Sequence, residues 1–201
     1  MAIPAQMVKE LRKLTAAGIL DCRKALEATD GDFEKAVDFL REKGLAKVAK
    51  RMSRDAKDGA VYSYIHDGGR IGVLVEVNCE TDFVARTDEF KSLLKGVALQ
   101  IAGMSPRYLR REDVPESVIT HESEVYRAAA LEEGKPEKIV ERIVEGRIEK
   151  FYKEICLMEQ DFILDEDKTI DDLIKDQIVT IGENIVIRRF ARYELGESLG
   201  E

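Results

Sequence analysis

The spacing of apolar residues along the first quarter of the chain is helical. Apolar side chains recur there every three to four positions in three runs: residues 5–14, 21–28 and 32–44. Each apolar stripe is narrow and each run is short. The pattern predicts a compact three-helix module, which together with a basic linker occupies residues 1–54.

Glycines separate these runs at regular intervals. Gly18, Gly31 and Gly44 lie 13 residues apart. We expect Asp32 to cap the third helix at its start and Gly44 to end it in a left-handed conformation. Because so small a module buries little surface, it is suited to presenting helix faces to another protein, although a packing subdomain of the larger core is an equally open interpretation.

A run of basic residues follows the third helical pattern. Within residues 41–58 it consists of Arg41, Lys43, Lys47, Lys50, Arg51, Arg54 and Lys57, with few large apolar residues between them. We expect this linker to be helical at first and irregular later. One interpretation is a contact strip for an acidic partner, but charge runs are more often solvated connectors.

The pattern changes to that of β-strands at residue 59. Residues 59–67 and 71–79 are rich in β-branched and aromatic residues, and the turn sequence DGGR joins them. This combination predicts a β-hairpin. The second strand is almost entirely apolar, so we expect it to lie in the centre of its sheet with both faces covered.

Helical periodicity returns in the remainder of the chain. It covers four segments, residues 87–103, 116–134, 136–160 and 167–184, with a short extended segment over 105–115. Thr87 is placed to cap the first of these helices. Residues 184–196 read as a last strand, with Arg188, Arg189 and Arg192 on its wet face. The chain as a whole predicts an α+β fold, with helices packed on a small, mainly antiparallel sheet.

One of these helices carries a heptad-like seam. Val144, Ile148, Phe151, Ile155 and Met158 follow one another at alternating steps of four and three. Such a seam could join two copies of the chain. It covers only about two repeats, whereas coiled coils sustain three or four, so the pattern favours packing within the chain, with 116–134 and 136–160 as an antiparallel pair.

Composition and charge restrict the classes of function. The net charge is -8. Residues 1–58 hold 13 basic against 10 acidic residues, and the remainder carries a net charge of -11. Nucleic-acid binding needs clustered basic residues, so a protein partner is the better expectation. Apolar runs are too short to cross a membrane and the start of the chain lacks a signal-peptide pattern, so we expect a cytoplasmic protein.

Residues with chemical potential are scattered. Cys22, Cys79 and Cys156 show no spacing typical of disulfides or zinc sites. His66 and His121 lie outside any metal-binding or nucleophile motif, and no phosphate-binding glycine motif is present. We therefore predict that the protein is not an enzyme and binds neither a metal nor a cofactor.

The segment EVNCETDFVAR, residues 76–86, is unusual because an apolar strand ends in polar groups and an aromatic. Glu80 and Asp82 could be Mg²⁺ ligands of a phosphohydrolase, but two acids are too few for such a site. Taken by itself, Phe83 is more typical of a core aromatic at a strand end. An exposed aromatic serves as an anchor only where a partner offers a pocket.

Three separated segments resemble one known family. They are KELRKLTAAGILDCRKALEATDGDFEKAV, VEVNCETDFVART and GENIVIRRFARYELGE, and they span nearly the whole chain. They resemble the bacterial elongation factor Ts family, the guanine-nucleotide exchange factors for elongation factor Tu. The resemblance implies an N-terminal module similar to ubiquitin-associated domains, followed by an α+β core over residues 55–201.

The chain is shorter than the longer members of that family. Those members carry a second core subdomain with a coiled-coil insertion and a C-terminal helical module, whereas this chain stops soon after RYELGE. It therefore resembles the short-form members, which act as homodimers. The resemblance consequently implies elongation factor Tu, in its GDP-bound and nucleotide-free forms, and a second copy of the chain as partners.

The resemblance also implies a binding site. In the family the matching segment enters the GTPase domain of elongation factor Tu, so Thr81, Asp82, Phe83 and Val84 inherit the role of disturbing its Mg²⁺ site and releasing GDP. The turn AAGILDCR implies a second contact through Arg23, which stands where the family commonly has lysine and so changes the geometry of the charge. The alternative is an adaptor without exchange activity.

Overall fold

The computed structural model describes residues 3–15 and 17–198. Its elements in chain order are α1 (Ala5–Thr15), α2 (Ile19–Ala28), α3 (Phe33–Met52), β1 (Asp58–Ile65), β2 (Ile71–Cys79), α4 (Asp82–Ala85), α5 (Asp88–Met104), η1 (Arg111–Asp113), α6 (Glu116–Glu132), α7 (Glu137–Ile155), η2 (Leu157–Glu159), β3 (Asp161–Phe162), β4 (Asp165–Thr169), α8 (Ile170–Ile181) and β5 (Val186–Glu194). The fold is α+β, as the sequence predicts.

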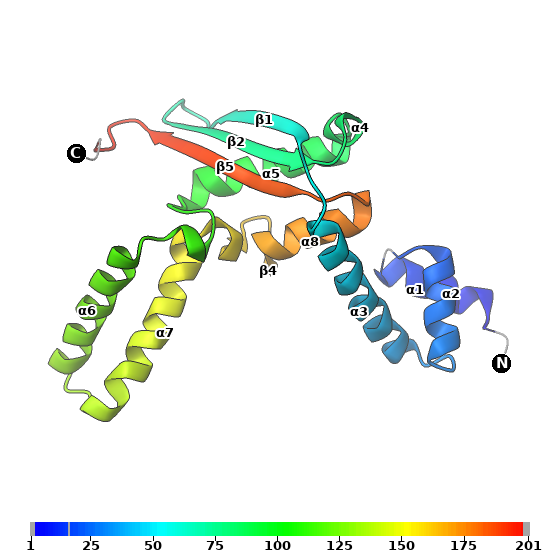
Figure 1. Cartoon of the computed structure of the whole chain (residues 1–201), viewed down its shortest axis with the longest axis horizontal. Coiled ribbons are helices and arrows are strands. Elements are labelled where there is room, and N and C mark those ends of the chain that lie inside the picture. Colours follow the sequence, from blue (N-terminus) through cyan, green and yellow to red (C-terminus); the bar gives the residue numbers. More distant parts are fainter. Residues whose placement is uncertain (1–2, 16, 199–201) are drawn as a thin grey trace.

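The three N-terminal helices pack around their own small core (Figure 1). Asp32 caps α3 as expected, because its side chain accepts a hydrogen bond from the Lys35 amide at 3.1 Å. The predicted helix end at Gly44 is wrong, since α3 continues to Met52. The resemblance of this module to ubiquitin-associated domains, and the domain boundary near residue 54, stay predictions.

Contacts with the larger core explain why α3 passes through Gly44. Val48 is only 4% exposed and belongs to the main hydrophobic core. The Arg51 guanidinium donates a hydrogen bond to the carbonyl of Ile178 at 2.7 Å, at the end of α8. A glycine inside a helix costs about 1 kcal/mol relative to alanine, and tertiary packing of this kind overrides that preference. The helical linker therefore ties the N-terminal module to the core.

The sheet has three antiparallel strands in the order β1-β2-β5, so β2 is central as predicted. Helices α5 and α8 lie on one side of it (Figure 1). The expectation that both faces of β2 are covered is wrong. Leu74 of β2 is 48% exposed, and Val61 and Ile65 of β1 are each 66% exposed, on what we call the open face. The apolar pattern reflects an open apolar surface rather than a second layer.

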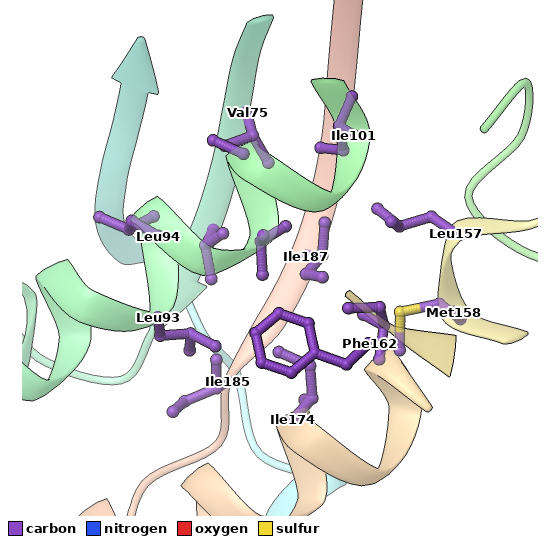
Figure 2. Packing of buried hydrophobic residues seen from close by; sticks show 14 of the residues in the cluster. Val75, Leu93, Leu94, Ile101, Leu157, Met158, Phe162, Ile174, Ile185 and Ile187 are labelled. Carbon is purple, nitrogen blue, oxygen red and sulfur yellow. The ribbon is translucent and has the colours of Figure 1, made fainter. Parts of the chain in front are cut away.

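The main core lies between the sheet and the helices on its covered side. Phe162 belongs to this core, and its ring lies among side chains of α5, α8 and the segment leading into β5 (Figure 2). Gly96 of α5 allows this approach, because a Cβ there would lie 3.2 Å from the ring. The short β3–β4 hairpin that delivers Phe162 was not predicted from the sequence.

Helices α6 and α7 form the predicted antiparallel pair, which projects from the core on the side opposite the N-terminal module (Figure 1). The seam residues Val144, Phe151 and Ile155 are buried within the chain, and Met158 lies beyond the end of α7 in the main core. The seam therefore packs internally, as its short length favoured.

The last strand carries its arginines on two faces. Arg188 and Arg189 are exposed and both approach Glu76, as expected for a wet face. Arg192 is an exception: it pairs in register with Val73 on the covered side, and its side chain is 14% exposed. The register of β2 and β5 shifts between Glu76 and Val77, so simple alternation misplaces residues along the strand.

Candidate functional site

Strand β2 delivers the unusual segment to one end of the sheet. Val73, Val75 and Val77 point into the core in alternation, and Asn78 and Cys79 are buried as well. The side-chain amide of Asn78 donates a hydrogen bond to the carbonyl of Asp58 at 3.1 Å, at the start of β1. The strand end is thus fixed to its neighbour before the chain leaves the sheet.

A single helical turn, α4, follows the strand and was not predicted. Thr81 is extended at its start, and α4 covers Asp82–Ala85. The next helix begins two residues later, where the Thr87 hydroxyl accepts a hydrogen bond from the Phe90 amide at 3.2 Å and donates one to the Val84 carbonyl at 2.9 Å. The Thr87 cap was predicted. We call residues 80–85 the tip.

The four predicted site residues face two directions. Phe83 is 80% exposed, more than any other large hydrophobic residue described. Asp82 is also exposed and forms an ion pair with Arg86 at 2.7 Å. Thr81 and Val84 are partly buried, and Val84 packs on the main core. The tip therefore presents an aromatic ring and a carboxylate outward while its other side chains anchor it.

The turn between α8 and β5 holds the tip from behind. The Glu183 carboxylate accepts hydrogen bonds from the amides of Glu80 and Thr81, each at 3.0 Å, and from the Thr81 hydroxyl at 2.8 Å. In the opposite direction, the Asn184 amide donates to the Glu80 carboxylate at 2.7 Å. Residues more than 100 positions apart thus exchange hydrogen bonds.

Cys79 contributes to the same anchorage. Its thiol is buried and donates a hydrogen bond to the Thr81 carbonyl at 3.1 Å. Burial, and then the nearby charge of Glu183, raise the pKa of this thiol to about 11. Cys79 is therefore a neutral donor in the wall of the site rather than a nucleophile.

The second predicted contact lies on the N-terminal module. Arg23 is exposed on α2 and pairs with Glu27 at 2.9 Å, and the described residues give it no contact with the tip. Ile19 and Leu20, at the start of α2, are 56% and 72% exposed. Ala16, which belongs to the predicted contact turn, lies outside the described residues.

Ion pairs hold the first turn of α2 against α3. Asp21 accepts hydrogen bonds from Lys43 at 2.9 Å and Lys47 at 2.8 Å, which hold its pKa at about 2. These two lysines belong to the basic run predicted as a linker. Lys43 and Lys47 therefore contact an acidic residue of the N-terminal module itself, and these ion pairs join α2 to α3.

The candidate catalytic groups have structural partners. The Glu80 carboxylate accepts a hydrogen bond from Asn184, and His66 shares one with the Tyr64 hydroxyl at 2.9 Å. Among residues 3–15 and 17–198, no group of three or more potential metal ligands comes together. Nor does any described helix combine the length and the apolar character needed to cross a membrane.

Sequence reasoning missed Glu183 and Asn184 as parts of this site. Both lie in the last segment that resembles the family, and the helical pattern of residues 167–184 includes them. Their local sequence gives no indication of a partner 100 residues earlier. Only the polar groups at the end of β2 indicated that acceptors for their amides had to come from elsewhere.

Similarity to known proteins extends over all the helices and strands of this fold. The sequence model of the family described as Elongation factor TS matches residues 5–197. Elongation factor Ts of Syntrophomonas wolfei is 62% identical over 98% of this chain and 92% of its own, and that of Thermoanaerobacter sp. (strain X514) is 61% identical over 98% and 97%. That of Carboxydothermus hydrogenoformans is 60% identical over 99% and 92%. The chain belongs to the elongation factor Ts family of translation elongation factors.

Proposed function

We propose that this protein binds the GDP form of elongation factor Tu, disturbs the Mg²⁺ site of that GTPase and promotes exchange of GDP for GTP. The observation that carries the proposal is Phe83, which is 80% exposed on a tip tied down on its other side. Exposing a large aromatic side chain to water is energetically unfavourable, and a side chain exposed in this way is typical of a binding anchor.

The chemistry of the tip is suited to displacing a metal-bound phosphate. Mg²⁺ requires nearly ideal octahedral geometry, so a small shift of its ligands weakens its binding. The Phe83 ring acts as an apolar wedge that enters a pocket and moves partner side chains. The Asp82 carboxylate competes for groups around the Mg²⁺, after exchanging Arg86 for a partner on the GTPase. Once the Mg²⁺ is lost, the phosphates of GDP are held less tightly.

Exchange then follows from linkage. A factor that binds the nucleotide-free GTPase more tightly than the GDP form must lower the affinity for GDP by the same ratio. GTP displaces the factor by the same reciprocity. No covalent bond is made or broken in these steps, so the protein is an exchange factor rather than an enzyme in the chemical sense.

The N-terminal module is the second contact in this proposal. Ile19 and Leu20 form an exposed apolar pair at the start of α2, and Arg23 lies one turn further along the same helix. An apolar centre with a charged edge is the usual composition of a protein interface. This module would bind the GTPase domain beside the tip. Such a partner places the protein in the cytoplasm.

The open face of the sheet supports pairing of two copies. Val61, Ile65 and Leu74 are exposed on it together with Tyr193, which is 64% exposed and lies opposite Gly72 in the register. A contiguous apolar patch of this kind is typical of an interface. We therefore infer a homodimer, which light scattering after size-exclusion chromatography would test by giving about twice the mass of 22.7 kDa.

Fluorescent GDP bound to elongation factor Tu provides the test of exchange. Catalytic amounts of the protein should accelerate GDP release. Phe83→Ala should reduce that acceleration by about 30-fold, since loss of an interface anchor costs 2 kcal/mol or more, and Asp82→Ala should reduce it by about 3- to 10-fold. Leu131→Ala, which removes a half-exposed apolar residue of α6, is the matched control and should retain wild-type acceleration.

Two results would contradict the proposal. If the wild-type protein binds elongation factor Tu without accelerating GDP release, the adaptor alternative is correct. If both tip variants fold and exchange at the wild-type rate, the tip is not the element that acts on the Mg²⁺ site. A loss of activity in Leu131→Ala as well would indicate a general effect of removing surface apolar groups.

A further inference from the structure

We propose that Glu183 is a positioning residue for nucleotide exchange, acting through the tip without touching the partner. The inference rests on the proposed function, in which Asp82 and Phe83 contact the GTPase. Glu183 lies in the turn between α8 and β5, and its carboxylate is the acceptor that fixes the path of the chain from β2 into α4. Its effect on exchange is therefore indirect.

Glu183 accepts hydrogen bonds from backbone amides that lie just beyond the end of the sheet. The amides of Glu80 and Thr81 follow the last residue of β2, so these donors need an acceptor outside the ladder. One carboxylate oxygen accepts from both amides at 3.0 Å, and the other accepts from the Thr81 hydroxyl at 2.8 Å. One carboxylate thus accepts from two backbone amides and one side-chain hydroxyl within three residues of Phe83.

The carboxylate group is better suited to this task than a neutral side chain. Hydrogen bonds to an ionised acceptor are shorter and stronger than those between neutral groups. A glutamine at this position keeps the shape and one oxygen, but its NH₂ group would have to replace the oxygen that accepts from Thr81. An alanine leaves all three donors without this acceptor. The series Glu, Gln, Ala therefore grades the strength of the hold on the tip.

Glu183 is itself fixed by its neighbours. Gly182, with φ +94°, ends α8 and turns the chain, and its amide donates to the Ile178 carbonyl at 3.1 Å. On the other side, the Asn184 side-chain amide donates to the Arg54 carbonyl at 2.7 Å. The fold therefore fixes the position of the Glu183 carboxylate. This carboxylate lies beside the residues that follow α3, the last helix of the N-terminal module.

This arrangement joins the tip, through one hydrogen-bonded junction, to the segment that leads back to the N-terminal module. The Glu80 carboxylate accepts from the Asn184 backbone amide at 2.7 Å and lies 3.5 Å from the Arg54 guanidinium. Tip, α8–β5 turn and the segment after α3 are joined within these few residues. A tip that is ordered before binding loses less conformational entropy when it enters its partner, which increases affinity and the effect on GDP.

The test uses the full chain and fluorescent GDP bound to elongation factor Tu. We expect Glu183→Ala to reduce the acceleration of GDP release about tenfold, with Glu183→Gln in between, because the tip must then be ordered on binding. Glu166→Ala, an exposed acidic residue of β4, is the matched control and should act like the wild type. Circular dichroism and the melting temperature establish that each variant folds.

Two measurements separate positioning from a general loss of structure. Amide hydrogen exchange in Glu183→Gln should increase at residues 80–85 while the core strand β2 stays protected. In addition, the effect of Glu183→Gln on GDP release should disappear in a Phe83→Ala background, because residues that act through one group are not additive. If the two effects add fully, or if residues 80–85 stay protected, Glu183 does not act through the tip.

The outcomes also distinguish this inference from the function on which it rests. If the wild-type protein does not accelerate GDP release, the proposed function fails and hydrogen exchange alone decides whether Glu183 orders the tip. If the wild-type protein accelerates release and Glu183→Ala and Glu183→Gln both match it, the proposed function stands and the positioning role of Glu183 is overturned.

Discussion

The two ends of β2 lead into turns that are built in opposite ways. At the hairpin end, Gly68 and Gly69 adopt positive φ, and the bonds that close the turn are local, from the His66 amide to Ile71 and from the Gly69 amide to His66, each at 2.9 Å. At the other end, the tip is held by Glu183 and Asn184, more than 100 residues away.

The fold concentrates its long-range contacts at the tip and not at the hairpin turn. The hairpin turn only has to connect two strands, and residues with the right backbone preferences do so alone. The tip exposes an aromatic ring in a defined position, which local preferences cannot fix for a four-residue helix. An exposed anchor on a rigid mount therefore depends on other parts of the chain.

The largest effect is expected from Gly59 of β1, which lies at the end of the β1–β2 hairpin away from the turn. Gly59 has φ +138°, and a Cβ there would lie 2.7 Å from the Asn78 Cα and even closer to the Val77 carbonyl oxygen. Gly59→Ala should lower the free energy of unfolding by about 3 kcal/mol, measured by denaturant titration.

Gly68 provides the matched control for that change. Gly68 also has a positive φ, but a Cβ there meets open space. Gly68→Ala should therefore lower the free energy of unfolding by only about 1 kcal/mol. Equal losses in the two variants would show that the two ends of the hairpin tolerate a side chain equally well. That result would contradict the difference between the two ends of β2.

A smaller effect is expected where the tip joins α5. Thr87→Ala removes the cap that accepts from the Phe90 amide and donates to the Val84 carbonyl. It should lower the free energy of unfolding by about 1 kcal/mol, as the loss of a helix N-cap usually does. Thr87→Ser keeps the hydroxyl and should retain most of the stability. If Thr87→Ala is neutral in denaturant titration, the Thr87 cap does not help to hold the tip.

The smallest effect is expected on the reactivity of the Cys79 thiol, which lies beside the tip. Burial and the charge of Glu183 raise the pKa of Cys79 to about 11, so only about one thiol in a thousand is ionised at pH 8. Because the thiolate is the reactive form, alkylation should be slow and should increase as the pH rises toward 11. Glu183→Gln removes the charge, lowers the pKa of Cys79 and should speed its alkylation about 2- to 5-fold at pH 8.

Cys156 is the internal control for this measurement. It is buried, and its pKa is also raised to about 11, by burial and then by Glu159 rather than Glu183. Mass spectrometry of the two cysteine peptides from one sample would compare their rates. An equal increase at Cys79 and Cys156 in Glu183→Gln would indicate general loosening of the fold instead of a change at the tip.

Elements whose causes are local could be predicted from the sequence. Apolar periodicity placed the helices and the central strand, the turn DGGR placed the hairpin, and Asp32 and Thr87 marked two helix starts. These features depend on contacts within a few residues, which the sequence displays directly. The family followed from three segments of the sequence, and the comparisons confirm it over residues 5–197.

Features that depend on distant residues could not be predicted and are set by the fold. Gly44 lies inside α3 because Val48 docks on the core, one face of β2 stays open, and a register shift turns Arg192 inward. The tip takes its shape from Glu183. These features share a cause: each depends on whether an amide or an apolar face meets a partner far away in the chain, and the sequence shows neither that partner nor its absence.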